Sequence, residues 1–190
     1  MANLAVFASG SGSNFQALAE SVIPSDHSVC CLICDNGEAL ALQRASLLGI
    51  PSYHILYDGR PREEAEKEIL SLLADCSADL VALAGFMKIL SPRFINQFPG
   101  TIINIHPSLL PKYPGTRGIE ASFHSGDRKL GITIHEIDAG VDTGPIIMQK
   151  SFLKHDNETI ESVEKRIHTL EHASYPVVIM ELLDKIDSKS

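Results

Sequence analysis

The sequence has no tryptophan, few basic residues and no long apolar run. A transmembrane helix needs ~20 apolar residues in succession, and residues 1–6 lack the basic segment of a signal peptide. We therefore expect no membrane insertion. Lys and Arg number 16 against 24 Asp and Glu, for a net charge of −8, whereas a nucleic-acid surface needs clustered Lys and Arg. The composition thus predicts a cytoplasmic protein with no nucleic-acid partner.

Cysteines are also few, and they are unevenly placed. Cys30, Cys31 and Cys34 share one apolar segment, and Cys76 stands alone. Cys31 and Cys34 have the spacing of half a zinc site, but no second pair of Cys or His lies near them. Reduced thiols in the core of a strand, in a reducing compartment, are therefore the simpler interpretation.

A chain of 190 residues with 44% apolar content fits one domain. Short β-branched segments alternate with helix-like segments, which predicts an α/β fold with a mostly parallel sheet. We expect strands at 4–8, 29–34, 52–55, 79–85, 101–106, 130–137 and 146–152. We expect helices from residue 15 and at 39–48, 62–74, 92–98, 118–125 and 158–185, the last interrupted at Pro176.

The most informative segment is the expected strand at 101–106, which a proline-rich loop follows. Side chains two residues apart leave the same face of a strand, so Asn104 and His106 point the same way. They lie near the C-terminal end of the strand, where open α/β sheets build their sites. Asn can hold a developing oxyanion, and His can hold it or move a proton. The alternative is an Asn and a His that only cap a strand end.

A turn rich in glycine and serine follows the first expected strand, at residues 9–14. It leads into a helix, whose unpaired N–H groups and dipole favour an anion. Phe15 stands where the third glycine of a dinucleotide motif belongs, and the Gly-Lys-Ser/Thr of a P-loop is missing. One phosphate is therefore the expected ligand, with a plain tight turn as the alternative.

Two acids, Asp138 and Asp142, lie in a glycine-rich loop at 138–145. A carboxylate there could contact His106, orient its ring and stabilise the imidazolium. His135, just before this loop, is interpreted as a structural residue of its strand.

The apolar segment at 86–90 follows the expected central strand and could line a pocket for a flat aromatic ligand. A buried loop packed on the core is the alternative. Arg60 and Arg62, near the start of a charged helix, could bind an anionic tail of a ligand or could simply be solvated.

Other motifs support competing hypotheses. Asp35 lies 25 residues after Gly10, close to where a ribose-binding acid stands in a nicotinamide-dependent oxidoreductase. His168, Glu171 and His172 form the zinc pattern H-x-x-E-H, although no third ligand of the expected kind follows on a downstream helix. A non-catalytic module that senses a small molecule is a further possibility.

Several segments resemble the folate-dependent formyltransferases in order and spacing, over nearly the whole chain. They are SGSGSN at 9–14, LAGFMKIL at 83–90, NIHPSLLPKYPG at 104–115, DTGP at 142–145 and EHASYP at 171–176. The resemblance is closest to the members that formylate glycinamide ribonucleotide (GAR) in purine biosynthesis. From the length of 190 residues, we expect neither the C-terminal tRNA-binding domain nor the N-terminal regulatory domain of other members.

The resemblance implies formyl transfer from 10-formyltetrahydrofolate to the amine of GAR, without metal, with Asn104, His106 and Asp142 as the catalytic residues. It implies an α/β, Rossmann-like fold with a mostly parallel sheet and helices on both faces. It also implies one formyltransferase domain with a phosphate-binding half at 1–100 and a catalytic, folate-binding half at 101–190. The residues implied to contact GAR are Gly12, Ser13, Asn14 and Glu171. Those implied to contact the folate are Arg62, Met87, Lys88, Ile89, Leu90, Asn104, Asp138, Ala139, Gly140, Val141 and Asp142. The protein is expected to be a monomer or a homodimer.

Overall fold

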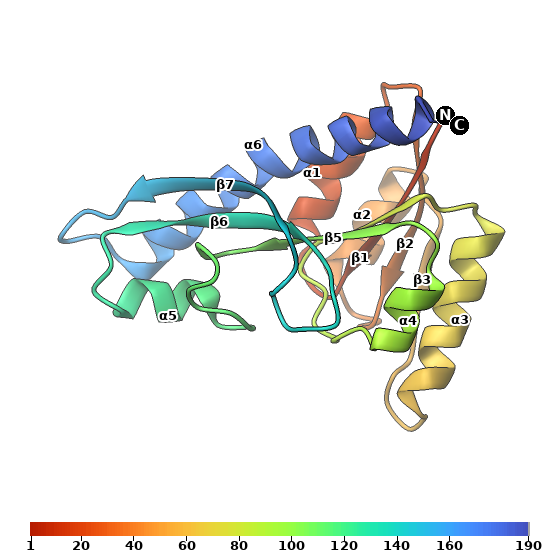
Figure 1. The fold of residues 1–190 in the computed structure, drawn as a ribbon, viewed down its shortest axis with the longest axis horizontal. Coiled ribbons are helices and arrows are strands. Elements are labelled where there is room, and N and C mark those ends of the chain that lie inside the picture. Colours follow the sequence, from red (N-terminus) through yellow and green to blue (C-terminus); the bar gives the residue numbers. More distant parts are fainter. Residues whose placement is uncertain (190) are drawn as a thin grey trace.

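The computed structural model describes residues 1–189, which form a seven-stranded sheet with helices around it (Figure 1). The strands are β1 (Asn3–Ala8), β2 (Ser28–Cys34), β3 (Ser52–His54), β4 (Leu80–Leu83), β5 (Thr101–His106), β6 (Lys129–Glu136) and β7 (Ile146–Leu153). The helices are α1 (Ser13–Val22), α2 (Leu40–Leu47), α3 (Arg62–Asp75), α4 (Pro92–Gln97), α5 (Gly118–His124) and α6 (Ile160–Asp187). Each predicted strand and helix is present; β5 has the predicted ends, and the ends of the others differ.

The sheet is mostly parallel, as predicted. Its order is β3-β2-β1-β4-β5-β6-β7. The first five strands in this order pair in parallel, and β6 and β7 extend the sheet antiparallel beyond β5. This order places β1 and β4 at the centre, with their C-terminal ends at one edge of the sheet.

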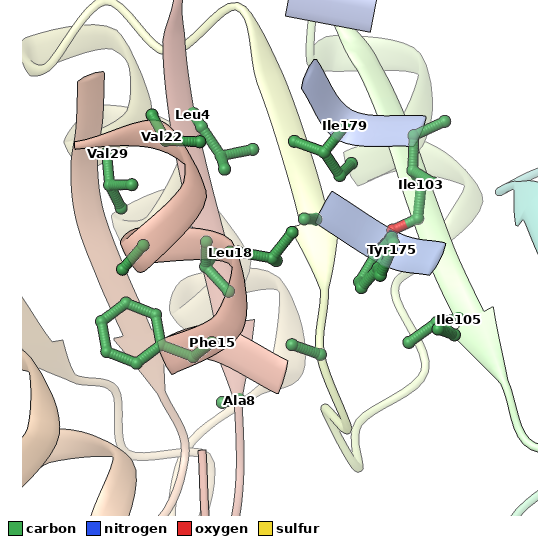
Figure 2. Packing of buried hydrophobic residues seen from close by; sticks show 14 of the residues in the cluster. Leu4, Ala8, Phe15, Leu18, Val22, Val29, Ile103, Ile105, Tyr175 and Ile179 are labelled. Carbon is green, nitrogen blue, oxygen red and sulfur yellow. Dashed lines mark hydrogen bonds between the residues drawn. The ribbon is translucent and has the colours of Figure 1, made fainter. Parts of the chain in front are cut away.

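Helices cover both faces of the sheet, which confirms the Rossmann-like α/β prediction. Helices α1, α2 and α6 bury apolar side chains on one face, among them Leu18, Ala41 and Ile179. Figure 2 shows this face, with Leu18 of α1 and Ile179 of α6 pointing into the same core. Helices α3 and α4 bury Ile69 and Phe94 on the opposite face.

The longest helix differs from the prediction, because α6 continues without a break through Pro176. A proline inside a helix removes a hydrogen bond and costs about 3 kcal/mol. Tyr175, Val178 and Ile179 flank it and are fully buried against the sheet, and burying one such side chain contributes about 1.5–3 kcal/mol. Packing outweighs the proline, so the predicted interruption is wrong. Neither α6 nor another helix within residues 1–189 is long and apolar enough to cross a membrane.

Tyr175 also joins α6 to the two strands next to the candidate site. Its hydroxyl oxygen lies 3.0 Å from the carbonyl oxygen of Leu83 at the end of β4 and 2.9 Å from that of Ile103 in β5. Figure 2 shows the Tyr175 ring beside Ile103. A buried tyrosine hydroxyl needs such a partner. The contact holds the end of β4 and the middle of β5 against the same helix.

The central strand is shorter than predicted, because β4 ends at Leu83. The apolar residues after it form a loop, in which Met87 and Ile89 are exposed while Leu90 is buried. Half of this apolar segment therefore faces outward at the C-terminal edge of the sheet.

Candidate active site

A pocket of about 370 Å³ lies at the C-terminal edge of the parallel strands. Its walls are the turn before α1, the loop after β4, the end of β5, the loop between β6 and β7, and one side of α6. The predicted site residues that line it are Gly12, Ser13, Asn14, Met87, Lys88, Ile89, Leu90, Asn104, His106, Asp138, Gly140, Val141, Asp142 and Glu171. Segments from distant parts of the chain thus meet where open α/β sheets bind ligands.

Two predicted contact residues lie outside the lining. Arg62 begins α3, and its Nη1 atom donates to the carbonyl oxygen of Ile89 at 3.4 Å, so it contacts the pocket loop without facing the pocket. Ala139 is exposed in the loop between β6 and β7. Both residues border the pocket.

Asn104, His106 and Asp142 converge in the pocket wall. Nδ2 of Asn104 lies 3.5 Å from Oδ1 of Asp142, and Nδ1 of His106 lies 3.4 Å from Oδ2 of the same carboxylate. On the other face of β5, Ile103 and Ile105 pack into the core, as their spacing predicted. The predicted contact between a loop carboxylate and His106 is therefore present, and Asp142 makes it.

Asp142 is held in place by its backbone and by a hydrogen bond from the loop after β5. Its φ of 55° is left-handed, a conformation that Asp tolerates better than most residues. The N–H of Gly115 donates to Oδ2 at 2.7 Å. Burial opposes ionisation, but the hydrogen bonds from His135 and Gly115 and the charge of His106 outweigh it and lower the pKa of Asp142 to about 2. The side chain is thus a carboxylate at neutral pH.

His135 contacts the same group from inside the sheet, since it is fully buried and does not line the pocket. This position agrees with the structural role predicted from the sequence, but the sequence did not reveal its contacts with Asn104 and Asp142. It lies in β6 directly opposite Asn104. Its Nδ1 atom is 2.8 Å from the carbonyl oxygen of Glu136, which places a proton on Nδ1. Nε2 then faces Nδ2 of Asn104 at 3.2 Å and Oδ1 of Asp142 at 3.6 Å. In the neutral ring Nε2 accepts from Asn104, and in the imidazolium it donates to Asp142.

His106 is buried and has oxygen atoms near both ring nitrogens. Nε2 lies 2.8 Å from the carbonyl oxygen of Tyr113, and Nδ1 faces Asp142. A doubly protonated ring can donate to both. An amide donor, an imidazole able to carry charge and an ionised carboxylate can together stabilise an oxyanion and move a proton.

At the opposite end of the pocket, Glu171 accepts two hydrogen bonds. Its Oε2 atom lies 2.9 Å from Nδ2 of Asn14 and 2.9 Å from Nδ1 of His168. The hydrogen bond to Glu171 raises the pKa of His168 above its ordinary value, against the effect of burial. Oδ1 of Asn14 is buried and has no partner within residues 1–189. Because such an oxygen is costly to leave unpaired, this end is suited to a ligand that donates a hydrogen bond.

Asn14 is in the first turn of α1, and this helix start has no side-chain cap. Gly12 precedes it with φ 71°, and a Cβ atom there would lie 2.7 Å from Cα of Ala41. Only glycine therefore fits this turn. Ser13 lines the pocket with its neighbours, so the unpaired N–H groups of the first helical turn are available to an anion, as the sequence predicted.

The geometry gives little support to the two competing motifs. His168 lines the pocket, but His172 is exposed, and the two rings stack with centroids 6.3 Å apart instead of converging. Asp35 lies outside the pocket lining, with Oδ2 3.9 Å from Nζ of Lys88. Phe15 fills the core where a dinucleotide motif has its third glycine.

Comparison with known proteins extends the resemblance seen in the sequence. The family described as formyl transferase matches residues 2–179. The chain is 41% identical over 186 residues to phosphoribosylglycinamide formyltransferase of Bacillus subtilis, covering 96% of this chain and 95% of that protein. It is 34% identical over 180 residues to the Escherichia coli protein of that name, covering 93% and 85%. A solved structure of glycinamide ribonucleotide transformylase 1 from Geobacillus kaustophilus matches with TM-score 0.91 and 41% identity, covering 96% of this chain and 99% of that one.

Proposed function

Because the chain belongs to the formyl transferase family, we propose that it transfers a formyl group from 10-formyltetrahydrofolate to the amine of 5'-phosphoribosylglycinamide, GAR, in purine biosynthesis. The relatives that it matches over nearly their whole length carry the name of this enzyme. One observation carries the proposal at the level of the site. Asn104, His106 and Asp142 meet in a pocket that also contains the uncapped start of α1.

The proposed reaction is a direct transfer through a tetrahedral intermediate. As the GAR amine attacks the formyl carbon, Nδ2 of Asn104 would exchange its 3.5 Å contact with Asp142 for a hydrogen bond to the oxygen that gains negative charge, and the positive charge of protonated His106 would stabilise that oxygen. Collapse of the intermediate breaks the bond to N10 of the folate. One proton leaves the attacking amine and one arrives at N10, so the transfer is balanced without metal or oxidant.

Asp142 would serve this transfer as a carboxylate. With a pKa of about 2, it is ionised throughout the neutral range, so it carries no proton when the reaction begins. It would stabilise the imidazolium of His106 and assist transfer of the proton from the attacking amine to N10, directly or through water. His135 would orient both Asn104 and Asp142, since its ring contacts the two side chains.

The two substrates would enter from opposite ends of the pocket. The ribonucleotide phosphate would bind the turn of Gly12, Ser13 and Asn14, with Glu171 near the glycinamide. The folate would lie along Met87, Lys88, Ile89, Leu90, Asp138, Gly140 and Val141. Arg62 and Ala139 would contact it only where it extends past the pocket.

In this arrangement residues 1–100 would supply the phosphate-binding half and residues 101–190 most of the catalytic half of one domain. We also propose a cytoplasmic location, because the four cysteines form no disulfide, as is usual in a reducing compartment. The active form would be a monomer or a homodimer.

The function is tested by following the absorbance of 10-formyltetrahydrofolate with and without GAR. Folate consumption only when GAR is present, with formyl-GAR as the product, is the expected result. Consumption without GAR, with release of formate, would make water the acceptor and contradict the proposal. If the folate is not consumed in either case, the protein would be better explained as a non-catalytic binding module.

A further inference from the structure

We propose that Cys30, Cys31 and Cys76 form a binding site for a thiophilic metal ion of the Zn²⁺ or Cu⁺ class, separate from the pocket. The three sulfur atoms lie within 4.8 Å of one another. Sγ of Cys76 lies 3.1 Å from Sγ of Cys30 and 3.8 Å from Sγ of Cys31. None of the three lines the pocket described above.

A β-bulge brings two adjacent cysteines to one face of β2. Neighbouring residues of a regular strand point to opposite faces. The pairing register between β1 and β2 shifts between Leu4 and Ala5, so that Ala5 pairs with Cys31 and Cys30 is the extra residue. Cys30 and Cys31 consequently both pack in the core under α3. Cys76, the C-cap of α3, supplies the third thiol.

Cys31 and Cys34, whose spacing resembles half a zinc motif, do not lie together in the fold. Cys34 packs on the opposite face of the sheet from Cys31. Its thiol donates to the carbonyl oxygen of Asn36 at 3.2 Å. Cys34 is therefore a matched control: it lies on the same strand but outside the cluster.

The distances suit coordination with small adjustments. A Zn–S bond of about 2.3 Å in a tetrahedral site gives an S–S separation of about 3.8 Å. The separation between Cys31 and Cys76 already has this value, and Cys30 would move away from Cys76 by about 0.7 Å to reach it. A disulfide would use two sulfurs, whereas all three thiols meet here.

The surroundings allow an ion to enter. Cys31 is buried, while Cys30 and Cys76 are half-buried and reach solvent. A water molecule could therefore complete four ligands around Zn²⁺, whereas Cu⁺ accepts thiolates alone. Each thiol that binds releases its proton to solvent, and no electron is transferred. The ion would tie β2 to the end of α3, so its binding should stabilise the fold.

The test uses reduced, full-length protein. Zn²⁺ is titrated in competition with a chromophoric chelator, and Cu⁺ is titrated anaerobically in competition with bicinchoninate. We expect one equivalent of at least one ion per chain, with a Tm rise on the order of 5 °C at a hundredfold excess over Kd. Cys76→Ser and Cys31→Ser should weaken binding at least about 100-fold, since each removes one of three ligands. Cys34→Ser should bind as the wild type does.

Cys30→Ser should disturb folding less than Cys31→Ser, because the Cys30 side chain is only half-buried. If Cys31→Ser does not fold, the loss of metal binding is measured with Cys30→Ser instead. Failure of both ions to bind, or equal binding by wild type and Cys76→Ser, would overturn the site. So would a Cys30–Cys76 disulfide formed with glutathione disulfide by a protein that retains neither ion. Formyl transfer should not change when the metal is chelated, so this result is distinguishable from failure of the proposed function.

Discussion

The two ends of the pocket differ in how their polar groups are satisfied. At one end, Asn104, His106 and His135 all lie within 3.6 Å of the Asp142 carboxylate, which also accepts the N–H of Gly115. These contacts exist in the folded chain alone. They form a connected group whose geometry does not depend on a ligand.

At the other end, contacts are left unmade. Oδ1 of Asn14 is buried without a partner in the described part of the chain, and α1 begins without a side-chain cap. A bound ligand that donates a hydrogen bond to Asn14 and carries negative charge toward α1 would supply the missing partners. The end with Asp142 is therefore arranged by folding before charge develops during the reaction, whereas the end with Asn14 completes its hydrogen bonds when a ligand binds. Substitutions at the first end should therefore lower kcat, and those at the second should raise KM.

The largest effect is expected from Asn104→Ala. Loss of one oxyanion donor typically lowers kcat by about 10²–10³, and KM for either substrate should change little by comparison. Steady-state kinetics with both substrates measures this split. Asn96→Ala, an exposed position on α4, is the control and should behave as wild type. An unaltered kcat would remove Asn104 from the mechanism.

Asp142 should reveal its contacts in the pH dependence of stability. Because its pKa is about 2 in the fold against an ordinary 3.8, its contribution is fully present above about pH 4 and is lost as pH falls through 2. The shift corresponds to about 2 kcal/mol. Urea unfolding of wild type and Asp142→Asn should show their difference in unfolding free energy shrinking by this amount from pH 5 to pH 2. A difference that stays constant with pH would contradict the ion-pair account.

Asn14→Ala tests the open end. The change removes a hydrogen bond to Glu171 and the buried oxygen that has no partner within residues 1–189, so we expect KM for GAR to rise about tenfold with kcat nearly unchanged. Ser21→Ala, near the other end of the same helix and outside the pocket lining, is the control. A fall in kcat at constant KM would place Asn14 with the catalytic group.

The smallest effect is expected from His168→Gln. The hydrogen bond to Glu171 raises the pKa of His168, so its positive charge is fully present below about pH 6.5 and is lost as pH rises through the raised value. KM for the anionic GAR should therefore increase with pH in wild type. Since the His168 side chain is 43% exposed, we expect only about a two- to fivefold change. The variant should show a flat profile, and a profile identical to wild type would exclude His168 as its cause.

Much of the fold could be predicted because its signals are local. The strand at 101–106 is β-branched, and the spacing of two residues placed Asn104 and His106 on one face of it. The helix break predicted at Pro176 is absent, because tertiary packing decides whether a helix continues through a proline. Local chemistry disfavours the helix there, but the buried neighbours of the proline hold it together.

Other parts of the site needed tertiary information. The role of His135 follows from the antiparallel register that sets it opposite Asn104, and nothing near it in the sequence shows that register. Asn14 and Glu171 bond across 157 positions of sequence. The cysteine cluster depends on a bulge that a pattern of alternating residues does not reveal.

A double-mutant cycle in kcat and KM tests the contrast between the two ends most directly. Asn104→Ala combined with Asp142→Asn should lower kcat little more than the worse single variant, because the two side chains act as one group. Asn104→Ala combined with Asn14→Ala should show the kcat loss of the first and the KM rise of the second, multiplied together. Independent losses within the first pair, or strong coupling within the second, would contradict the division of the pocket into a preformed catalytic end and an open binding end.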